Sequence, residues 1–359
     1  MHLRRLRIEN LRVIEQLEVE LAPGWNLFTG DNGAGKTSMV EAAFLLSHGR
    51  SFRTGIREAL VRVGCNGYSI FGELVKAGGE TRRVGIARSS GRIEAKLDGQ
   101  GVTAAELMHH AAVLCFEPGS HDLISGPADE RRRFLDWGVF HVEHGYLTYW
   151  RRYHRALKQR NAALRNGGGD SELDVWDREL ACAAEVLTAM RQRYVDALRP
   201  VLSDVLVGLL GELGQPEFAF LPGYDSSQSL DAVLLSRRDR DRLRGHTGSG
   251  PHRADWGLSF EGAPRREHLS RGQEKLCAFA CVLAQATLFF RTAGEWPVIC
   301  VDDLASEVDR GHQTRLLALL AQTNAQILVT GTEAPAALAE TAGAVAMFHV
   351  EQGRVSALL

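Results

Sequence analysis

The sequence lacks several features that mark secreted, membrane-spanning or metal-binding proteins. The N-terminal stretch MHLRRLRIEN has no apolar core and no small-residue cleavage site, so it is not typical of a signal peptide. The most apolar run, Leu276 to Phe290, is too short to span a bilayer and is typical of a buried helix. The six cysteines form no Cys-x-x-Cys pair, which argues against zinc and redox motifs. We therefore expect a soluble, cytoplasmic protein with no membrane partner.

An overall excess of positive charge is also absent. The formal net charge is −2, so no global basic field indicates a nucleic-acid partner. Positive charge is concentrated instead in two stretches: residues 131–165 hold nine Arg or Lys against two acids, and residues 236–253 hold six against two. Phosphate contacts need only local patches of this kind. The sequence-based hypothesis for the first stretch names Arg151, Arg152, Arg155, Lys158 and Arg160, while solvated helix faces remain the alternative.

One short glycine-rich stretch, GDNGAGKTS, carries the clearest chemistry. It fits the phosphate-loop pattern Gly-x-x-x-x-Gly-Lys-Thr, with a short strand predicted before it and an apolar helix after it. Lys36 is expected to bridge β- and γ-phosphate oxygens and Thr37 to place its hydroxyl on Mg²⁺. The following helix N-terminus adds its positive end, so we predict ATP and Mg²⁺ as cofactors. The predicted ATP-binding residues are Gly30, Asp31, Asn32, Gly33, Ala34, Gly35, Lys36, Thr37 and Ser38.

A pair of acids follows a second apolar strand, Val298 to Val301. Asp302 is predicted to hold Mg²⁺, and Asp303 to orient or deprotonate the attacking water as the catalytic residue. The same pattern also suits a buried strand that simply ends in solvated acids.

A third motif indicates the class of ATPase. Leu269 and the four residues after it, Ser270-Arg271-Gly272-Gln273, resemble the signature motif of ABC-type ATPases, which is LSGGQ in its common form. The motif lies 30 residues before the acidic pair and opens the apolar helix predicted for residues 274–290. The resemblance implies that Ser270, Arg271, Gly272 and Gln273 bind the γ-phosphate of a nucleotide held by another subunit. It also implies an ATP-dependent homodimer, whose partner is touched by residues 305–309, which resemble the D-loop. A plain helix cap by Ser270 is the alternative.

Several absences narrow the class further. No Gln occurs from residue 101 to 158 to serve as a Gln loop, and no switch His follows the apolar residues 327–329. The opening, LRRLRIENLRVIEQLEVEL, resembles the I-x-N-F-R opening of the SMC and RecF branch. Only 234 residues separate Lys36 from Ser270, which leaves no room for a long coiled-coil arm. The chain therefore resembles the RecF family of bacterial DNA-repair ATPases over essentially its whole length. Further stretches that carry this resemblance are Gly49–Thr54, Phe116–Pro118, Arg131–Asp136 and Gly250–Arg253, although Ala254 stands where the family usually has an acid.

The resemblance implies a function. RecF-like proteins bind ATP, dimerise, bind DNA in the ATP state and hydrolyse ATP slowly. With RecO and RecR they promote the loading of RecA at single-stranded gaps, and they support replication-fork repair and the SOS response. The implied partners are DNA (single-stranded or gapped duplex), RecR and RecO.

The predicted fold class is α/β, with a P-loop ABC-type ATPase lobe interrupted by a mostly helical lobe. Residues 1–118 and 246–359 are assigned to the ATPase lobe and residues 119–245 to the helical insert, in which Pro200 is expected to kink or divide a long helix. Two other functions remain open. The energy subunit of a transporter would need a Gln loop and a membrane partner, and a small-molecule phosphotransferase would need no signature motif.

Overall fold

The structure is a computed structural model that describes residues 1–358, except for the side chain of Ala305. Packing divides the chain into two compact units, one formed by residues 1–121 with residues from 270 onward, the other by residues 122–269. By packing, residues 246–269 thus lie in the second unit. The lobe boundaries predicted after residues 118 and 245 stay a prediction.

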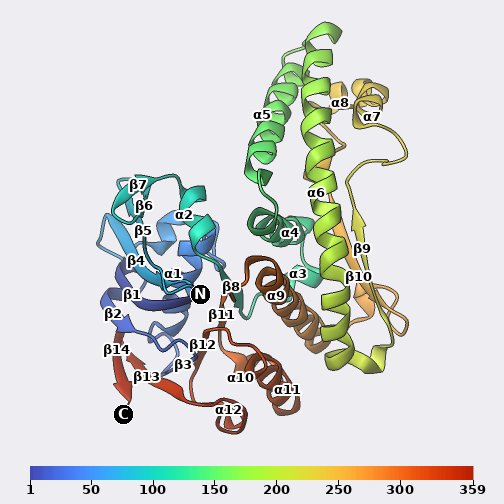
Figure 1. The fold of residues 1–359 in the computed structure, drawn as a ribbon. Helices are drawn as coiled ribbons and strands as arrows, with labels where there is room; N and C mark the ends of the chain where they lie inside the picture. The colour runs from blue at the N-terminus through green and yellow to red at the C-terminus, as the bar shows by residue number, and fades with distance from the viewer. Residues whose placement is uncertain (359) are drawn as a thin grey trace. The chain divides into compact units, whose positions relative to one another are not determined.

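A six-stranded sheet forms the centre of the first unit, in the order β14-β13-β3-β12-β11-β8 (Figure 1). Its strands are β3 (Trp25–Thr29), β8 (Val113–Phe116), β11 (Val298–Val301), β12 (Ile327–Gly331), β13 (Val345–Glu351) and β14 (Arg354–Leu358). Only the pairing of β13 with β14 is antiparallel. All four residues of β11 are buried, as a parallel strand covered on both faces requires. The carboxyl ends of β3, β11 and β12 therefore meet at one edge of the sheet.

A second sheet of the first unit is antiparallel, in the order β2-β1-β4-β5-β6-β7. Its strands are β1 (His2–Leu11), β2 (Ile14–Glu20), β4 (Gly67–Val75), β5 (Thr81–Ser89), β6 (Arg92–Leu97) and β7 (Gln100–Val102). Alternating apolar residues give it one buried face, which includes Leu6 and Ile8 of β1. The helices of the unit are α1 (Lys36–His48), α2 (Ala104–His110), α9 (Arg271–Ala293), α10 (Leu304–Glu307), α11 (Arg310–Ala321), α12 (Ala336–Thr341) and the 3₁₀ turn η1 (Arg57–Leu60).

Helix α9 is the apolar helix expected from the sequence. Among the described residues it alone is long and apolar enough to cross a membrane, but 72% of its apolar window is buried within the protein. Cys277 and Cys281 are fully buried on it. Burial of this kind is typical of a core helix, so the prediction of a buried helix is confirmed.

The second unit is organised around a hairpin of two helices, α5 (Tyr146–Arg165) and α6 (Asp170–Leu210), which run side by side (Figure 1). Helix α6 is one continuous helix of 41 residues that passes through Pro200. The expected division at Pro200 does not occur, because Pro200 faces solvent while Leu198, Val201 and Leu202 are buried around it. Packing of the apolar stripe offsets the loss of one backbone hydrogen bond.

A two-stranded antiparallel ribbon, β9 (Pro216–Leu221) with β10 (Asp255–Phe260), lies in the same unit. Its register runs from Asp255 opposite Leu221 to Phe260 opposite Pro216. The remaining elements are α3 (Asp122–Ser125), α4 (Ala128–Val142), α7 (Leu230–Ser236), α8 (Arg238–Arg244) and the 3₁₀ turns η2 (Gly211–Leu213), η3 (Pro251–Arg253) and η4 (Arg266–His268).

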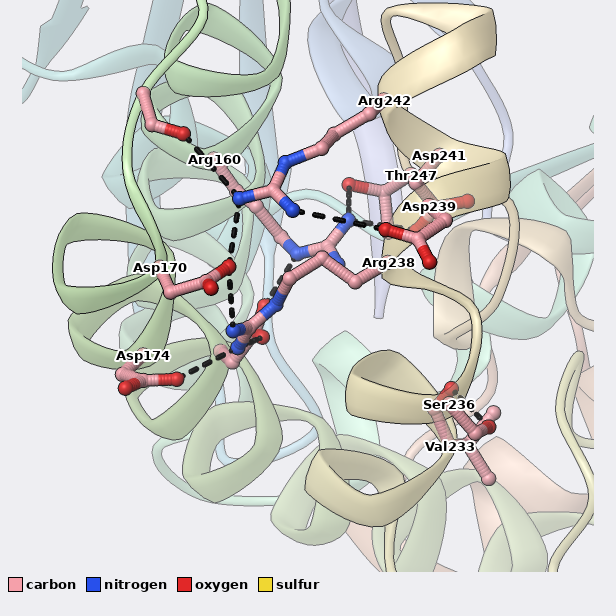
Figure 2. A network of polar contacts seen from close by, with 12 residues as sticks. Arg160, Asp170, Asp174, Val233, Ser236, Arg238, Asp239, Asp241, Arg242 and Thr247 are labelled. Carbon is pink, nitrogen blue, oxygen red and sulfur yellow. Dashed lines mark hydrogen bonds and ion pairs between the residues drawn. The ribbon is translucent and has the colours of Figure 1, made fainter.

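Buried ion pairs fasten α8 to the helical hairpin (Figure 2). Arg160 of α5 is fully buried and donates to Asp177 of α6, to Asp241 of α8 at 2.8 Å and to Thr247 at 2.9 Å. Arg238 of α8 donates to Asp177 at 2.6 Å and also pairs with Asp170 and Asp174. The end of the hairpin is thus held by charge as well as by apolar contacts.

Candidate nucleotide site

The glycine-rich loop connects the end of β3 to the start of α1, at the carboxyl edge of the parallel sheet. Gly30 has a φ of +148°, and a Cβ there would lie 2.1 Å from the backbone oxygen of Val350. Only glycine allows this close approach of loop and β13. Gly35, with a φ of +115°, is the N-cap of α1 and makes no side-chain cap. The first N–H groups of α1 are therefore left without a side-chain acceptor, as a phosphate-binding helix end requires.

Lys36 lies buried inside this loop. Its ammonium donates to the backbone oxygens of Gly30 at 2.6 Å and Asp31 at 2.9 Å. Burial lowers the pKa of Lys36, while the carboxylates of Asp303, Asp302 and Asp31 act in the opposite direction. The ammonium is thus positioned over the loop, where anionic oxygens would favour its charged form.

Two hydroxyl groups and one carboxylate, from three separate segments of the chain, meet at the end of β11. Asp302 is buried, and its Oδ1 accepts hydrogen bonds from Thr37 at 3.1 Å and from Thr330 at 2.5 Å. Burial raises the pKa of Asp302, and the two hydroxyl hydrogen bonds partly oppose that shift. The structure thus brings together the two residues predicted to hold Mg²⁺. Thr330, which the sequence reasoning did not single out, joins them from the end of β12.

Asp303 follows directly and occupies a left-handed conformation with a φ of +53°. Its backbone N–H donates to the Thr330 backbone oxygen at 3.1 Å, and its Oδ2 accepts from Ser306 at 2.7 Å. These bonds hold a non-glycine residue in a sparsely populated conformation, which is common at functional sites. Asp303 faces the same cavity as the phosphate loop.

The cavity over the loop has a volume of about 260 Å³. Lys36, Thr37 and Asp303 line it, together with two arginines to which the sequence reasoning gave no role, Arg12 and Arg53. Arg12 is held by the buried carboxylate of Glu41 through bonds of 2.9 and 3.0 Å. Arg12 lies in the opening motif and Arg53 in the stretch Gly49–Thr54. Their position in these two motifs could have indicated that they belong to the site.

The residues that resemble the signature motif lie away from the phosphate loop of the same chain. Ser270 caps α9 by accepting from the Gln273 backbone N–H at 3.3 Å, and the Gln273 side chain accepts from the Ser270 N–H at 2.9 Å. This capping box satisfies the helix end internally. None of Ser270, Arg271, Gly272 or Gln273 lines the loop cavity of the same chain. Their predicted contact with a second subunit's nucleotide stays a prediction.

An ion pair joins the first turns of α9 to the segment that resembles a D-loop. The Lys275 ammonium lies 2.8 Å from Oε2 of Glu307 and donates to the Glu307 backbone oxygen at 3.0 Å. Ser306, next to Glu307, donates to the carboxylate of Asp303. Signature helix and predicted catalytic acid are thus connected through three short contacts.

The residues at this site suit ATP and Mg²⁺. The uncapped N-terminus of α1 and the Lys36 ammonium are donors for phosphate oxygens. Within the described chain no group of three or more His, Cys, Asp or Glu residues could hold a metal alone. A hydroxyl and one carboxylate match Mg²⁺, which in phosphate-binding sites uses one or two carboxylates plus substrate oxygens.

Comparison with known proteins identifies the family. The family model described as "RecF/RecN/SMC N terminal domain" matches residues 2–356. The protein "DNA replication and repair protein RecF" of Xanthomonas axonopodis pv. citri is 49% identical, over 99% of this chain and 98% of that protein. The protein of the same name from Stenotrophomonas maltophilia is 48% identical over the full length of both. This chain belongs to the RecF family.

Solved structures agree with this assignment at the level of fold. A structure of the recombination mediator RecF with ATP, from the RecFOR pathway, matches with a TM-score of 0.90 at 24% identity, covering 100% of this chain and 98% of the other. An Smc head domain from Pyrococcus furiosus matches with a TM-score of 0.60 at 14% identity, covering 99% and 96%. The predicted fold class, an α/β ABC-type ATPase lobe with a mostly helical insert, is confirmed.

Proposed function

We propose that this protein is an ATP-gated DNA-binding protein of recombinational repair. The observation that carries the proposal is the convergence of Lys36, Thr37, Asp302 and Asp303 at one sheet edge, in a chain of the RecF family. Relatives at 48–49% identity are named DNA replication and repair proteins, and a structural relative is named with ATP and the RecFOR pathway.

Different residues of the nucleotide site have different roles in nucleotide binding and hydrolysis. The N-terminal amides of α1 and the Lys36 ammonium would bind the β- and γ-phosphates, and Thr37 with Asp302 would hold Mg²⁺, which would supply positive charge to the phosphates. Asp303 orients the attacking water and accepts its proton. Arg12 and Arg53 add positive charge at the cavity wall. The expected activity is a slow ATPase that regulates binding.

Dimerisation completes the site. Ser270, Arg271, Gly272 and Gln273 of a second copy close on the γ-phosphate, so that two nucleotides lie between two subunits. The dimer then places two copies of a modest basic surface where one DNA molecule meets both. Binding of DNA therefore depends on ATP although the chain carries a net charge of −2.

In the cell this switch would act in the cytoplasm with RecO and RecR. The ATP-bound dimer would mark single-stranded gaps or gapped duplexes, promote RecA loading there, and support fork repair and the SOS response. These steps follow from family membership and not from a contact in this chain.

Fluorescence anisotropy of a labelled gapped duplex tests the proposal, with protein titrated in ATP and without nucleotide. Lys36→Met serves as the control because it removes the ammonium that binds the phosphates. We expect ATP-dependent binding in the wild type and none in the variant. Absence of DNA binding in every nucleotide state would overturn the proposal and reopen the transporter and phosphotransferase alternatives.

Ser270→Arg tests the dimer separately. A bulky cation at the cap of α9 should block closure on a second subunit while leaving the loop cavity of its own chain intact. Mass measured by light scattering should stay that of a monomer in ATP, although the variant still binds nucleotide. A dimer of normal affinity would remove the signature residues from the interface.

A further inference from the structure

The cationic residues of α5 fall into two sets with different surroundings. This helix holds six Arg or Lys residues and no acid. Arg160 is fully buried in the ion-pair network of Figure 2. Arg152 makes a two-pronged pair with Glu179 of α6, at 2.5 and 2.7 Å. Neither is available to bind an external ligand without breaking these pairs.

The other four cations form a single exposed stripe. Arg151, Arg155, Lys158 and Arg165 are all exposed, and none has a carboxylate partner in the part of the chain that the structure describes. Their spacing of four, three and seven residues keeps them on one helix face. At 1.5 Å per residue the stripe is about 21 Å long. Arg160 lies on the opposite side, so the burial of one arginine and the exposure of the stripe follow from the same orientation of α5.

Several acids of α6 and α8 are paired with cations outside the stripe. Asp170, Asp174, Asp177 and Asp241 accept from arginines of the network, which include Arg242 in addition to Arg160 and Arg238. Glu179, which acts electrostatically on Arg155, is held by Arg152. None of these carboxylates forms an ion pair with a cation of the stripe.

The surroundings of the stripe favour nucleic acid over protein. None of the exposed large hydrophobic residues of the described chain lies on α5, whereas protein interfaces have an apolar centre. The aromatic residues of α5 are buried or, for Tyr149 and Trp150, half-buried, whereas binding of single strands relies on stacking of bases on exposed aromatic rings. A straight row of cations without either feature matches the regularly spaced phosphates of a duplex.

We propose that the outward face of α5, formed by Arg151, Arg155, Lys158 and Arg165, binds the phosphate backbone of duplex DNA independently of sequence. The proposal deepens the proposed function, on which it rests for the identity of the polymer. It also corrects the sequence-based hypothesis, because Arg152 and Arg160 are withdrawn and Arg165 is added.

Salt dependence of DNA affinity is the sharpest test. Anisotropy with a labelled duplex is measured over a series of salt concentrations, with full-length protein in ATP. Arg155→Gln with Lys158→Gln should weaken binding roughly tenfold or more and reduce the slope of log K against log[salt] by about 1.8 for each subunit that contacts the duplex, at about 0.9 per lost phosphate contact. The loss should be equal for unrelated duplex sequences.

A matched control is available on β6 of the first unit. Arg92 and Lys96 are also an exposed Arg and Lys without a carboxylate partner among the described residues. Arg92→Gln with Lys96→Gln changes the net charge equally and should leave affinity and slope at wild-type values. A second stripe pair, Arg151→Gln with Arg165→Gln, guards against misfolding of the first. ATP turnover without DNA should be unchanged in all three.

The outcomes separate the two proposals. ATP-dependent DNA binding with wild-type slope in both stripe variants would overturn the α5 surface and leave the proposed function standing. A loss confined to single-stranded DNA would overturn the duplex assignment. No DNA binding by the wild type would overturn both proposals.

Discussion

Two regions of the molecule, the phosphate loop and the end of the helical hairpin, use charged residues in opposite ways. Around the phosphate loop a few charges are brought to one edge of a parallel sheet and left facing a cavity, as with Lys36 and Asp303. At the end of the helical hairpin charges are paired with one another, and the central ones, such as Arg160 and Asp177, are buried. The first arrangement keeps charge available for a ligand, whereas the second uses charge to hold helices together. Residue type alone therefore does not decide function; the partners of each charge do.

The first prediction concerns the available charges and has the largest expected effect. Asp303→Asn should lower the rate of ATP turnover by about 10²- to 10⁴-fold, because an amide cannot take the proton of the attacking water. ATP binding and ATP-dependent dimerisation should persist, since Lys36, Thr37 and Asp302 are unchanged. Single-turnover hydrolysis with equilibrium nucleotide binding measures both. Unchanged turnover would place the water-activating group elsewhere in the cavity.

The second prediction concerns a substitution that breaks the buried ion pairs of the helical hairpin. Arg160→Met leaves Asp241 buried without its guanidinium and leaves Asp177 paired with Arg238 alone; removing one partner of a buried ion pair typically costs about 3–5 kcal/mol. Hydrogen exchange in α5 and α6 should accelerate strongly while nucleotide binding by the first unit is retained. Arg152→Met is the matched control. Its pair with Glu179 is exposed and contributes about 0–1 kcal/mol. Equal protection in the two variants would show that the buried network does not hold the hairpin.

These two regions also differ in how far the sequence predicted them. The loop motif is local, so the positions of Gly30 to Ser38 follow from one strand, one turn and one helix. Asp302 could be placed beside Thr37 because parallel strands end at a common edge. Thr330, Arg12 and Arg53 were missed as site residues because they reach the cavity from separate segments.

In the helical unit the sequence showed where arginines are concentrated, but not which of them are paired inside the protein and which are exposed. Arg152 and Arg160 were grouped with Arg155, although their partners lie 27, 17 and 81 residues away in the chain. Long-range pairing of this kind leaves no local pattern. The uninterrupted helix through Pro200 is similar, because packing across the hairpin overrides a local helix-breaking signal.

A third prediction tests the connection between the signature helix and the catalytic acid. Reversing either Lys275→Glu or Glu307→Lys should lower turnover roughly tenfold, since a partly buried charged contact is lost. Combining both reversals should restore much of the rate, because the pair is rebuilt with exchanged signs. Turnover at saturating ATP, alongside nucleotide affinity, checks this. A double variant no better than the singles would mean that the pair does not couple the two elements.

The smallest expected effect concerns a backbone hydrogen bond that holds the phosphate loop and involves no charged group. Gly353, in the turn between β13 and β14, donates its N–H to the Ala34 backbone oxygen at 2.7 Å. Its φ is +76°, and a Cβ there would lie 2.9 Å from the backbone oxygen of Val13. Gly353→Ala should therefore displace the turn from the loop and weaken ATP binding several-fold, in addition to about 1–2 kcal/mol of backbone strain.

Gly91→Ala separates strain from contact in that last experiment. Gly91 has nearly the same φ, +79°, but a Cβ there meets nothing within 4 Å, and the residue lies between β5 and β6. Both variants should lose stability in thermal unfolding, Gly353→Ala more than Gly91→Ala because its Cβ also meets backbone atoms, whereas only Gly353→Ala should lose affinity for ATP. If both bind ATP as the wild type does, the β13–β14 turn does not shape the loop. If only Gly353→Ala is impaired, the nucleotide site includes a backbone contact from a strand pair that carries none of its chemistry.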